Sequence, residues 1–217
     1  MDTSNARAEI LARIQAANGA TSGAAQLLDA AWMALPRDYV RQGLLSVADR
    51  LHLFEERLTD YGAHVFHASP KELPGVIERI LTDRGKSKIL IPEGLPQSWS
   101  PSNIKLQQDD ALDAFALDTS EGVLTSATVA IAATGTIILQ SGAGQGRRAL
   151  SLAPDYHLCV VFAGQVVETV PEAFTRLAAT STQATTLISG PSATADIEMT
   201  RIQGVHGPRF LDVVLVR

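Results

Sequence analysis

The spacing of hydrophobic residues changes between helical and strand periods along most of the chain. Apolar side chains recur at three- and four-residue steps over residues 44–61, which predicts a long amphipathic helix. A coiled-coil partner helix is the alternative for this segment, but its short length favours a helix packed on a sheet. The other predicted helices are 73–82 and 172–179, and the predicted strands between them are 63–67, 88–91, 104–106 and 157–162. Strands that alternate with helices at this spacing predict an α/β domain with a mainly parallel sheet flanked by helices.

The middle of the chain departs from this alternation. Two apolar runs with strand character, 128–132 and 136–140, are separated only by a few residues that include Thr134 and Gly135. Because this connection is too short for a helical crossover, the two runs are predicted to pair as an antiparallel hairpin. The predicted sheet is therefore mixed, which disfavours a plain dinucleotide-binding Rossmann domain.

The C-terminal region has the densest cluster of polar residues with a possible chemical role. A strand-like run at 185–188 meets a Ser-Gly-Pro-Ser turn, a helical pattern follows, and a glycine-rich turn at 204–208 leads to a final strand at 210–216. This order predicts a right-handed βαβ unit. Small ligands in open α/β sheets bind outside the carboxyl ends of strands. The predicted ligand-binding residues of this region are Ser189, Gly190, Ser192, Thr194 and His206.

His206 and the acidic pair of this region each have two interpretations. His206 stands between glycines and is either a catalytic residue or a structural one. Asp196 and Glu198 either stabilise the start of the predicted helix or belong to a polar network that binds a ligand. Residues two apart point away from each other on a helix, so the two acids do not form a catalytic pair.

A second candidate site is the loop at 142–148. Backbone N–H groups near Gly144 and Gly146 can converge on an anion, and Arg147 and Arg148 can clamp a carboxylate or a phosphate. The loop lacks the spacing of a P-loop and of the Rossmann fingerprint. The alternative is a mobile loop with solvated arginines.

The N-terminal region has a different composition from the rest. Residues 6–17 have the pattern of a peripheral helix, and the following segment is rich in Ala, Gly and Ser. We therefore expect residues 1–35 to form a helix and a flexible strap ahead of an α/β domain at 36–217, and the strap to be ordered by docking.

Composition and charge exclude several classes of function. Hydrophobic residues make up 46% of the chain, which is enough for a substantial core, and the net charge of −5 argues against nonspecific nucleic-acid binding. We find no apolar run long enough to span a membrane and no signal-peptide core, so a cytoplasmic protein is expected.

The cysteine and histidine content argues against a metal or redox centre in this chain. Cys159 is the only cysteine and lies in an apolar run, so it is expected to be a buried core residue. A single cysteine cannot hold a cysteine-ligated iron–sulfur cluster. His52, His64, His67 and His157 show no metal-ligand spacing, so we expect no metal and no cofactor.

Several segments resemble the lactate-utilisation (LUD) domain family. The C-terminal match consists of 188–198 followed by 204–208. The middle match consists of Gly135 and Thr136 with the following strand, then 144–152, Pro154 and His157; residues 36–39 resemble the family's N-terminal segment. The resemblance covers roughly 36–217. It places Thr134, Gly135 and Thr136 among the candidate ligand-binding residues.

Membership of this family would imply a fold similar to the NagB, ribose-5-phosphate isomerase and CoA-transferase group. It would also imply a role in bacterial L-lactate utilisation beside cysteine-rich iron–sulfur proteins. One position departs from the family: many relatives carry a glutamate at the hairpin, where this chain has Ala133. A glutamate is the nucleophile in CoA transferases of this fold group, and alanine cannot replace it.

Three functions follow as hypotheses. The first is a non-redox accessory subunit that oxidises L-lactate to pyruvate only together with iron–sulfur partners. The second is a stand-alone enzyme of the isomerase/CoA-transferase group that acts on a small phosphorylated or carboxylated substrate. The third is a regulatory module that binds a small carboxylate.

Overall fold

The computed structural model describes residues 3–18, 22–194, 202–203 and 207–217. The chain divides into two compact units, Met1–Tyr39 and Val40–Arg217. The first unit contains helix α1 (Thr3–Ala17) and helix α2 (Ser22–Met33). Helix α2 occupies most of the segment expected to be a flexible strap, so this segment contains a helix that the sequence analysis did not predict. Four alanines in α2 explain the difference, because alanine has the highest intrinsic helix propensity.

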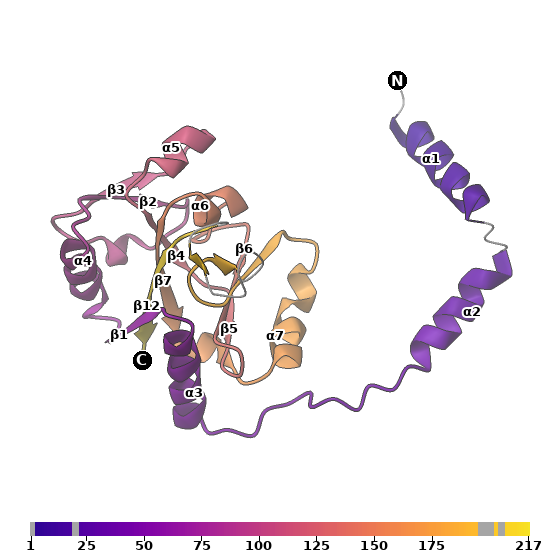
Figure 1. Cartoon of the computed structure of the whole chain (residues 1–217), viewed down its shortest axis with the longest axis horizontal. Helices are drawn as coiled ribbons and strands as arrows, with labels where there is room; N and C mark the ends of the chain where they lie inside the picture. The colour runs from indigo at the N-terminus through magenta and orange to yellow at the C-terminus, as the bar shows by residue number, and fades with distance from the viewer. Residues whose placement is uncertain (1–2, 19–21, 195–201, 204–206) are drawn as a thin grey trace. The chain divides into compact units, whose positions relative to one another are not determined.

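The second unit is built on a six-stranded sheet in which all strands run parallel (Figure 1). Its strands, in spatial order, are β1 (His64–Ala68), β12 (Phe210–Val216), β7 (Tyr156–Phe162), β4 (Val123–Ser126), β2 (Lys88–Ile91) and β3 (Lys105–Gln108). The central strands β7 and β12 are buried on both faces, as their nearly continuous apolar sequences predict. The predicted α/β class with a mainly parallel sheet is confirmed.

A second sheet contains the predicted hairpin. Its order is β8 (Val166–Val167), β5 (Val129–Ile131), β6 (Thr136–Gln140) and β9 (Thr185–Ile188). Strands β5 and β6 pair antiparallel, which confirms the hairpin, while β5 and β8 pair parallel. The antiparallel pairs β5–β6 and β6–β9 thus lie in this smaller sheet, and the six-stranded sheet is parallel throughout.

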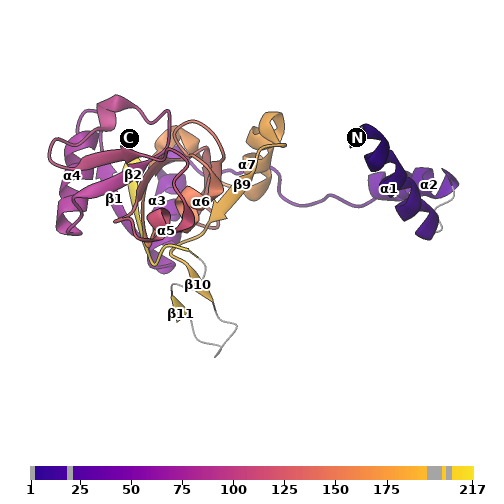
Figure 2. The ribbon, with the colours of Figure 1, turned by 90° about the horizontal axis from the view of Figure 1, so that it is seen from above.

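The predicted C-terminal βαβ unit is wrong. Strand β9 pairs antiparallel with β6, whereas β12 lies in the other sheet between β1 and β7. Between them, β10 (Ala193–Thr194) and β11 (Ile202–Gln203) form an antiparallel pair, to one side of the two sheets in Figure 2. The predicted helix falls mainly on 195–201, outside the described residues. Hydrophobic spacing identified β9 and β12 as strands, but it carries no information on which sheet each strand joins.

The two sheets pack face to face around the main core. Residues of β7 and β12 such as Val161 and Val213 contact the inner face of the small sheet and helix α3 (Val47–Asp60). Helix α4 (Leu73–Asp83) covers the opposite face of the large sheet, and α7 (Val170–Leu177) covers the outer face of the small sheet (Figure 1). These three helices were predicted from the sequence.

The remaining elements are short. Helix α5 (Ala114–Asp118) and helix α6 (Arg148–Leu152) pack beside β4 and β2. Single 3₁₀ turns are formed by η1 (Gln97–Trp99), η2 (Ala163–Gln165) and η3 (Ala178–Thr180). Strand β4 and both short helices were not predicted.

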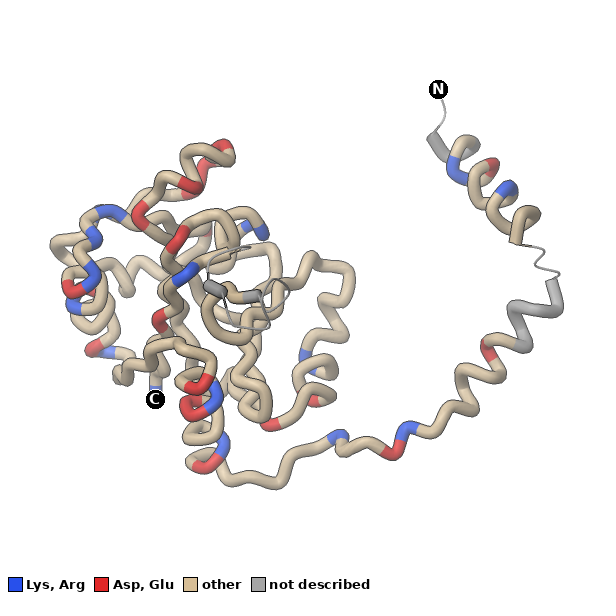
Figure 3. Tube along the Cα trace, viewed as in Figure 1, with Lys and Arg blue, Asp and Glu red and all other residues tan. Residues whose placement is uncertain are grey.

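Charged residues lie on the outer surfaces of the helices. Figure 3 shows Lys and Arg interspersed with Asp and Glu along α3, whose opposite face buries Leu51, Phe54 and Leu58. Across the described part of the chain, every helix is too short or too polar to cross a membrane.

Candidate functional site

A cavity of about 230 Å³ lies beside the turn that follows β9. We call it the β9 cavity. Its polar lining residues include Ser151, His157, Ser189 and Ser192, and Leu211 contributes apolar surface. The cavity is at the carboxyl end of β9, where the sequence placed a site. Because β9 belongs to the small sheet, this place coincides with the amino ends of β7 and β12 in the large sheet.

His157, the second residue of β7, borders the β9 cavity and is the group that sequence reasoning missed. Its side chain is 1% exposed, and its Nε2 lies 2.7 Å from the Thr125 hydroxyl. Its Nδ1 has no hydrogen-bond partner among the described residues. Burial lowers the pKa of His157 from 6.5 to about 4, so the imidazole is neutral near pH 7. The sequence signals were a histidine inside an otherwise apolar strand and the presence of His157 in the segment that resembles the LUD family.

Thr125 connects His157 to the single cysteine. The Thr125 hydroxyl lies 3.7 Å from the Cys159 sulfur, which in turn lies 3.8 Å from the backbone carbonyl oxygen of Ser126. Cys159 is fully buried, as predicted, and burial raises the pKa of its thiol to about 12. The sulfur is therefore a protonated thiol at neutral pH.

The predicted residues of the hairpin join those of the turn after β9 through side-chain hydroxyls. Thr134 Oγ1 and Ser189 Oγ each lie 2.7 Å from Thr136 Oγ1. The structure thus brings together Thr134, Thr136 and Ser189, which are far apart in the sequence. Of these, Ser189 lines the β9 cavity.

The predicted glycines of this region have a packing role. Gly190 has a φ of +83°, and a Cβ added to it would lie 2.5 Å from the Cβ of Tyr61 at the end of α3. Gly135 has a φ of +58° and approaches the backbone and Cβ of Arg57 on the same helix. Both positions let α3 pack closely against the small sheet.

We expect Gly190→Ala to lower the free energy of unfolding by about 2–4 kcal/mol, since it adds a left-handed backbone cost to steric overlap. Gly62→Ala is the matched control, because Gly62 has a φ of +87° with no atom near its Cβ position. Urea unfolding of both variants separates the two effects. Equal losses would show that contact with Tyr61 contributes nothing.

The glycine-rich loop forms a separate and more open cavity at the carboxyl ends of β2 and β3. Gly146 and Arg147 line it together with Pro92, Gly94 and Asp109. The N–H groups of Gly144 and Gly146 donate to the carbonyl oxygens of Glu93 and Gly142, at 2.7 Å each. These hydrogen bonds use the two backbone N–H groups that were predicted from the sequence to bind an anion.

The two arginines of this loop differ. Arg147 makes a two-point ion pair with Asp109, at 2.7 and 2.9 Å, and also donates to the carbonyl of Leu112. The hydrogen bonds that Arg147 donates to the Asp109 carboxylate lower the pKa of Asp109 and raise the pKa of Arg147. The Arg148 side chain is exposed and has no hydrogen bond or ion pair with the described residues. Arg148 is thus the arginine whose charge remains open to an anionic ligand.

Three other predicted positions give less information. Thr194 belongs to β10, and Asp196 and His206 lie outside the described residues. Ala133 is exposed and borders a shallow hollow next to Arg57 and Asp60, apart from the lining of the β9 cavity. Within the described ranges, no group of three or more His, Cys, Asp or Glu residues could hold a metal ion.

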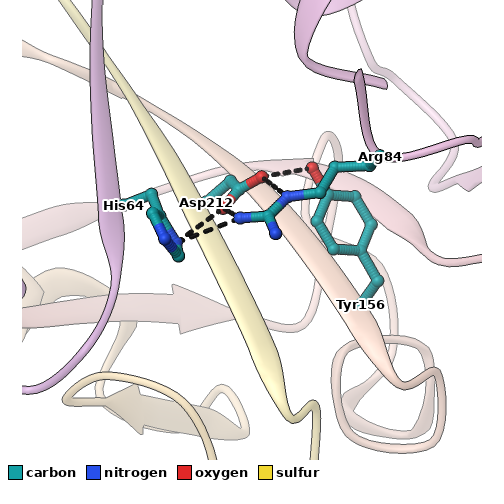
Figure 4. A network of polar contacts seen from close by, with 4 residues as sticks. All are labelled: His64, Arg84, Tyr156 and Asp212. Carbon is teal, nitrogen blue, oxygen red and sulfur yellow. Dashed lines mark hydrogen bonds and ion pairs between the residues drawn. The ribbon is translucent and has the colours of Figure 1, made fainter. Parts of the chain in front are cut away.

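A buried ion pair stabilises the other face of the large sheet. Asp212 of β12 is fully buried and accepts hydrogen bonds from Arg84 Nε at 2.8 Å, Arg84 Nη2 at 2.6 Å and the Tyr156 hydroxyl at 2.9 Å (Figure 4). His64 Nδ1 lies 3.4 Å from the same carboxylate. Burial and the Asp212 charge raise the pKa of Tyr156. This network could not be predicted from the sequence, because Asp212 stands in an apolar strand.

Comparison with known proteins identifies the family. The family model for the LUD domain matches residues 51–216. The chain is 46% identical over 175 residues to Lactate utilization protein C of Deinococcus radiodurans, covering 79% of this chain and 82% of that protein. It is 27% identical over 197 residues to Lactate utilization protein C of Bacillus pumilus, covering 76% and 78%. A crystal structure of a DUF162 family protein from Deinococcus radiodurans matches with a TM-score of 0.70 and 40% identity, covering 80% of this chain and all of that one. The chain therefore belongs to the LUD domain family.

Proposed function

We propose that this protein is a non-redox accessory subunit of a bacterial L-lactate utilisation system, in which iron–sulfur partner proteins oxidise L-lactate to pyruvate. The observation that carries the proposal is the 46% identity to Lactate utilization protein C of Deinococcus radiodurans, over most of both chains. Similarity at this level and coverage favours a shared role, and the lower-identity relative from Bacillus pumilus has the same name.

The chemistry of the single cysteine supports a role without an iron–sulfur cluster of its own. Iron–sulfur clusters need several thiolate ligands, and this chain has one cysteine. Cys159 is also buried inside β7 with a raised thiol pKa, so it supplies no accessible thiolate. In this proposal, electrons from lactate pass through the partner proteins.

The N-terminal unit is the proposed docking element for these partners. Helix α1 exposes Ile10 and Ile14, and helix α2 exposes Leu28 and Trp32. Apolar and aromatic side chains of this kind form the central contacts of protein interfaces. This extends the sequence-based expectation that residues 1–35 are a separate segment that docks.

The test is affinity capture of the tagged chain from L-lactate-grown cells of its source organism. We expect the captured material to contain iron and to oxidise L-lactate to pyruvate, and the purified chain alone to do neither. A chain that lacks residues 1–35 is the matched control and should lose the partners while keeping its fold by circular dichroism. Capture of the full chain without iron or lactate oxidation would contradict the accessory role. Retention of the partners by the truncated chain would contradict only the docking element.

A further inference from the structure

We propose that two copies of this chain associate along strand β9, which pairs antiparallel with β9 of the other copy around a twofold axis. This inference goes beyond the proposed function, because it rests on the edge of the small sheet and holds whether or not the chain acts in lactate oxidation. Strand β9 is the last strand of that sheet and pairs only with β6. Figure 2 shows it beside α7, at the margin of the second unit.

The register of β9 on β6 determines which of its backbone groups point outward. The N–H of Ser141 donates to the carbonyl oxygen of Ala184, so these two opposite residues form a hydrogen-bonded pair. Hydrogen-bonded and non-hydrogen-bonded pairs alternate along an antiparallel ladder. The alternation directs the N–H and C=O groups of Thr185 and Leu187 away from β6. These groups have no hydrogen-bond partner among the described residues, so β9 can accept another strand.

The sequence around β9 lacks the features that prevent pairing between sheet edges. Edge strands commonly carry charged residues or proline, and β9 has neither. By contrast, β3 at the edge of the large sheet contains Lys105, and both residues of β8 at the other edge of the small sheet are buried. The sequence has no charged residue between Arg176 and Asp196. Two copies with a net charge of −5 each can therefore approach along this stretch without direct repulsion between charged side chains.

A hollow of about 350 Å³ between α7 and β9 supplies an apolar contact surface. Its lining includes Phe174, Leu177, Thr185 and Leu187, and none of its lining residues is charged. Phe174 and Leu187 are each 52% exposed. Leu187 lies opposite Ile138, whose side chain packs beneath α7, so Leu187 is on the outer face of the sheet. A partner that buries these side chains would gain hydrophobic stabilisation.

A twofold axis at Thr186 satisfies both the backbone groups and the hollow. In this register, Thr185 of each copy lies opposite Leu187 of the other, and their outward N–H and C=O groups hydrogen-bond. Opposite residues point to the same face of the sheet, so Leu187 of one copy reaches the hollow that Thr185 and Phe174 line in the other. A twofold interface uses the same surface on both copies. The exposed leucine and the hollow lie on one surface, which is why the structure assigns this edge to a second copy.

The test is sedimentation velocity of the full chain over a range of concentrations. Because a contact of this size is typical of transient interfaces, we expect a monomer at about 5 µM and mainly a dimer at about 500 µM. Leu187→Lys places a charge on the edge and should weaken dimerisation at least about tenfold. Phe115→Lys is the matched control, since Phe115 is 76% exposed on α5 and outside the lining of the hollow.

A second variant separates strand pairing from apolar contact. Thr185→Pro removes one outward N–H at the first residue of β9, where proline is tolerated, and keeps Leu187. It should weaken dimerisation about tenfold, with the fold retained by circular dichroism. Dimerisation unchanged in Leu187→Lys would place the contact elsewhere, and dimerisation unchanged in Thr185→Pro would exclude strand pairing. Either result, or a wild-type chain that stays monomeric at the highest concentration, would overturn the proposal.

Thr186→Cys tests the register directly. The two residues at position 186 would form a non-hydrogen-bonded pair with Cα atoms about 4.5 Å apart, within the range of a disulfide. Cys159 is the only native cysteine and is buried, so it does not compete. We expect mild oxidation to link Thr186→Cys into dimers but to leave Thr182→Cys, exposed in the turn before β9, largely monomeric. Equal cross-linking of the two variants would contradict the twofold pairing.

Discussion

Asp212→Ala is expected to lower the free energy of unfolding by about 3 kcal/mol. The substitution leaves the Arg84 guanidinium without its carboxylate and the buried Tyr156 hydroxyl without its acceptor. The Tyr156 hydroxyl is buried, so the loss of its acceptor carries a full desolvation cost. The Arg84 side chain, which is 28% exposed, regains only part of its hydration when the carboxylate is removed. Urea unfolding at neutral pH, with the midpoint and the slope compared with wild type, measures the loss.

Asp155→Ala is the matched control for this prediction. Asp155 makes a similar two-point pair with Arg209, at 2.6 and 2.8 Å, but both side chains are about half exposed. Exposed ion pairs contribute little, since water solvates each partner when the other is removed. We therefore expect a much smaller loss than for Asp212→Ala. A similar loss in both variants would show that burial does not determine the contribution of the Asp212 pair.

A helix or strand could be predicted where the hydrophobic spacing within that segment was enough to identify it. Helices α3 and α4 carry apolar residues at helical spacing, and β2 and β7 are short apolar runs, so each was found within a few residues of its bounds. Strand β4 was missed because its four residues, Val123–Ser126, include two polar side chains and give too short a pattern. Both polar side chains have hydrogen-bond partners in the fold: Thr125 is hydrogen-bonded to His157, and Ser126 donates to the Gly144 carbonyl.

Pairing between distant strands could not be predicted from spacing. The sequence of β9 is compatible with either sheet, and its partner β6 is set by packing of the small sheet on α3 and α7. This pairing determines the position of Ser189. The site was expected at the carboxyl ends of the large-sheet strands, whereas the cavity lies at the amino ends of β7 and β12.

The candidate site was therefore predicted only in part. The turn after β9 has serine and glycine residues whose types suggested a site, and Ser189, Gly190 and Ser192 do line a cavity. His157 could not be recognised, because a histidine in a buried strand is most often a satisfied core residue. Only the fold shows that its Nε2 is hydrogen-bonded to Thr125 while its Nδ1 is buried without a partner among the described residues.

The free energy of unfolding is expected to fall by about 3 kcal/mol as the pH decreases from about 6.5 to about 4, because of His157 alone. Burial lowers the pKa of His157 in the folded protein from 6.5 to about 4, so the unfolded chain takes up the proton first. The stabilisation is therefore fully present above pH 6.5 and is lost as the pH falls through the folded pKa. Urea unfolding at several pH values in this range, compared between wild type and His157→Gln, measures the contribution. The variant should be less stable at pH 7 but should lose little further stability down to pH 4.5, whereas His52→Gln should keep the wild-type slope. A wild-type slope in His157→Gln would show that the pKa of His157 is the same in the folded and the unfolded protein, contrary to the lowering by burial.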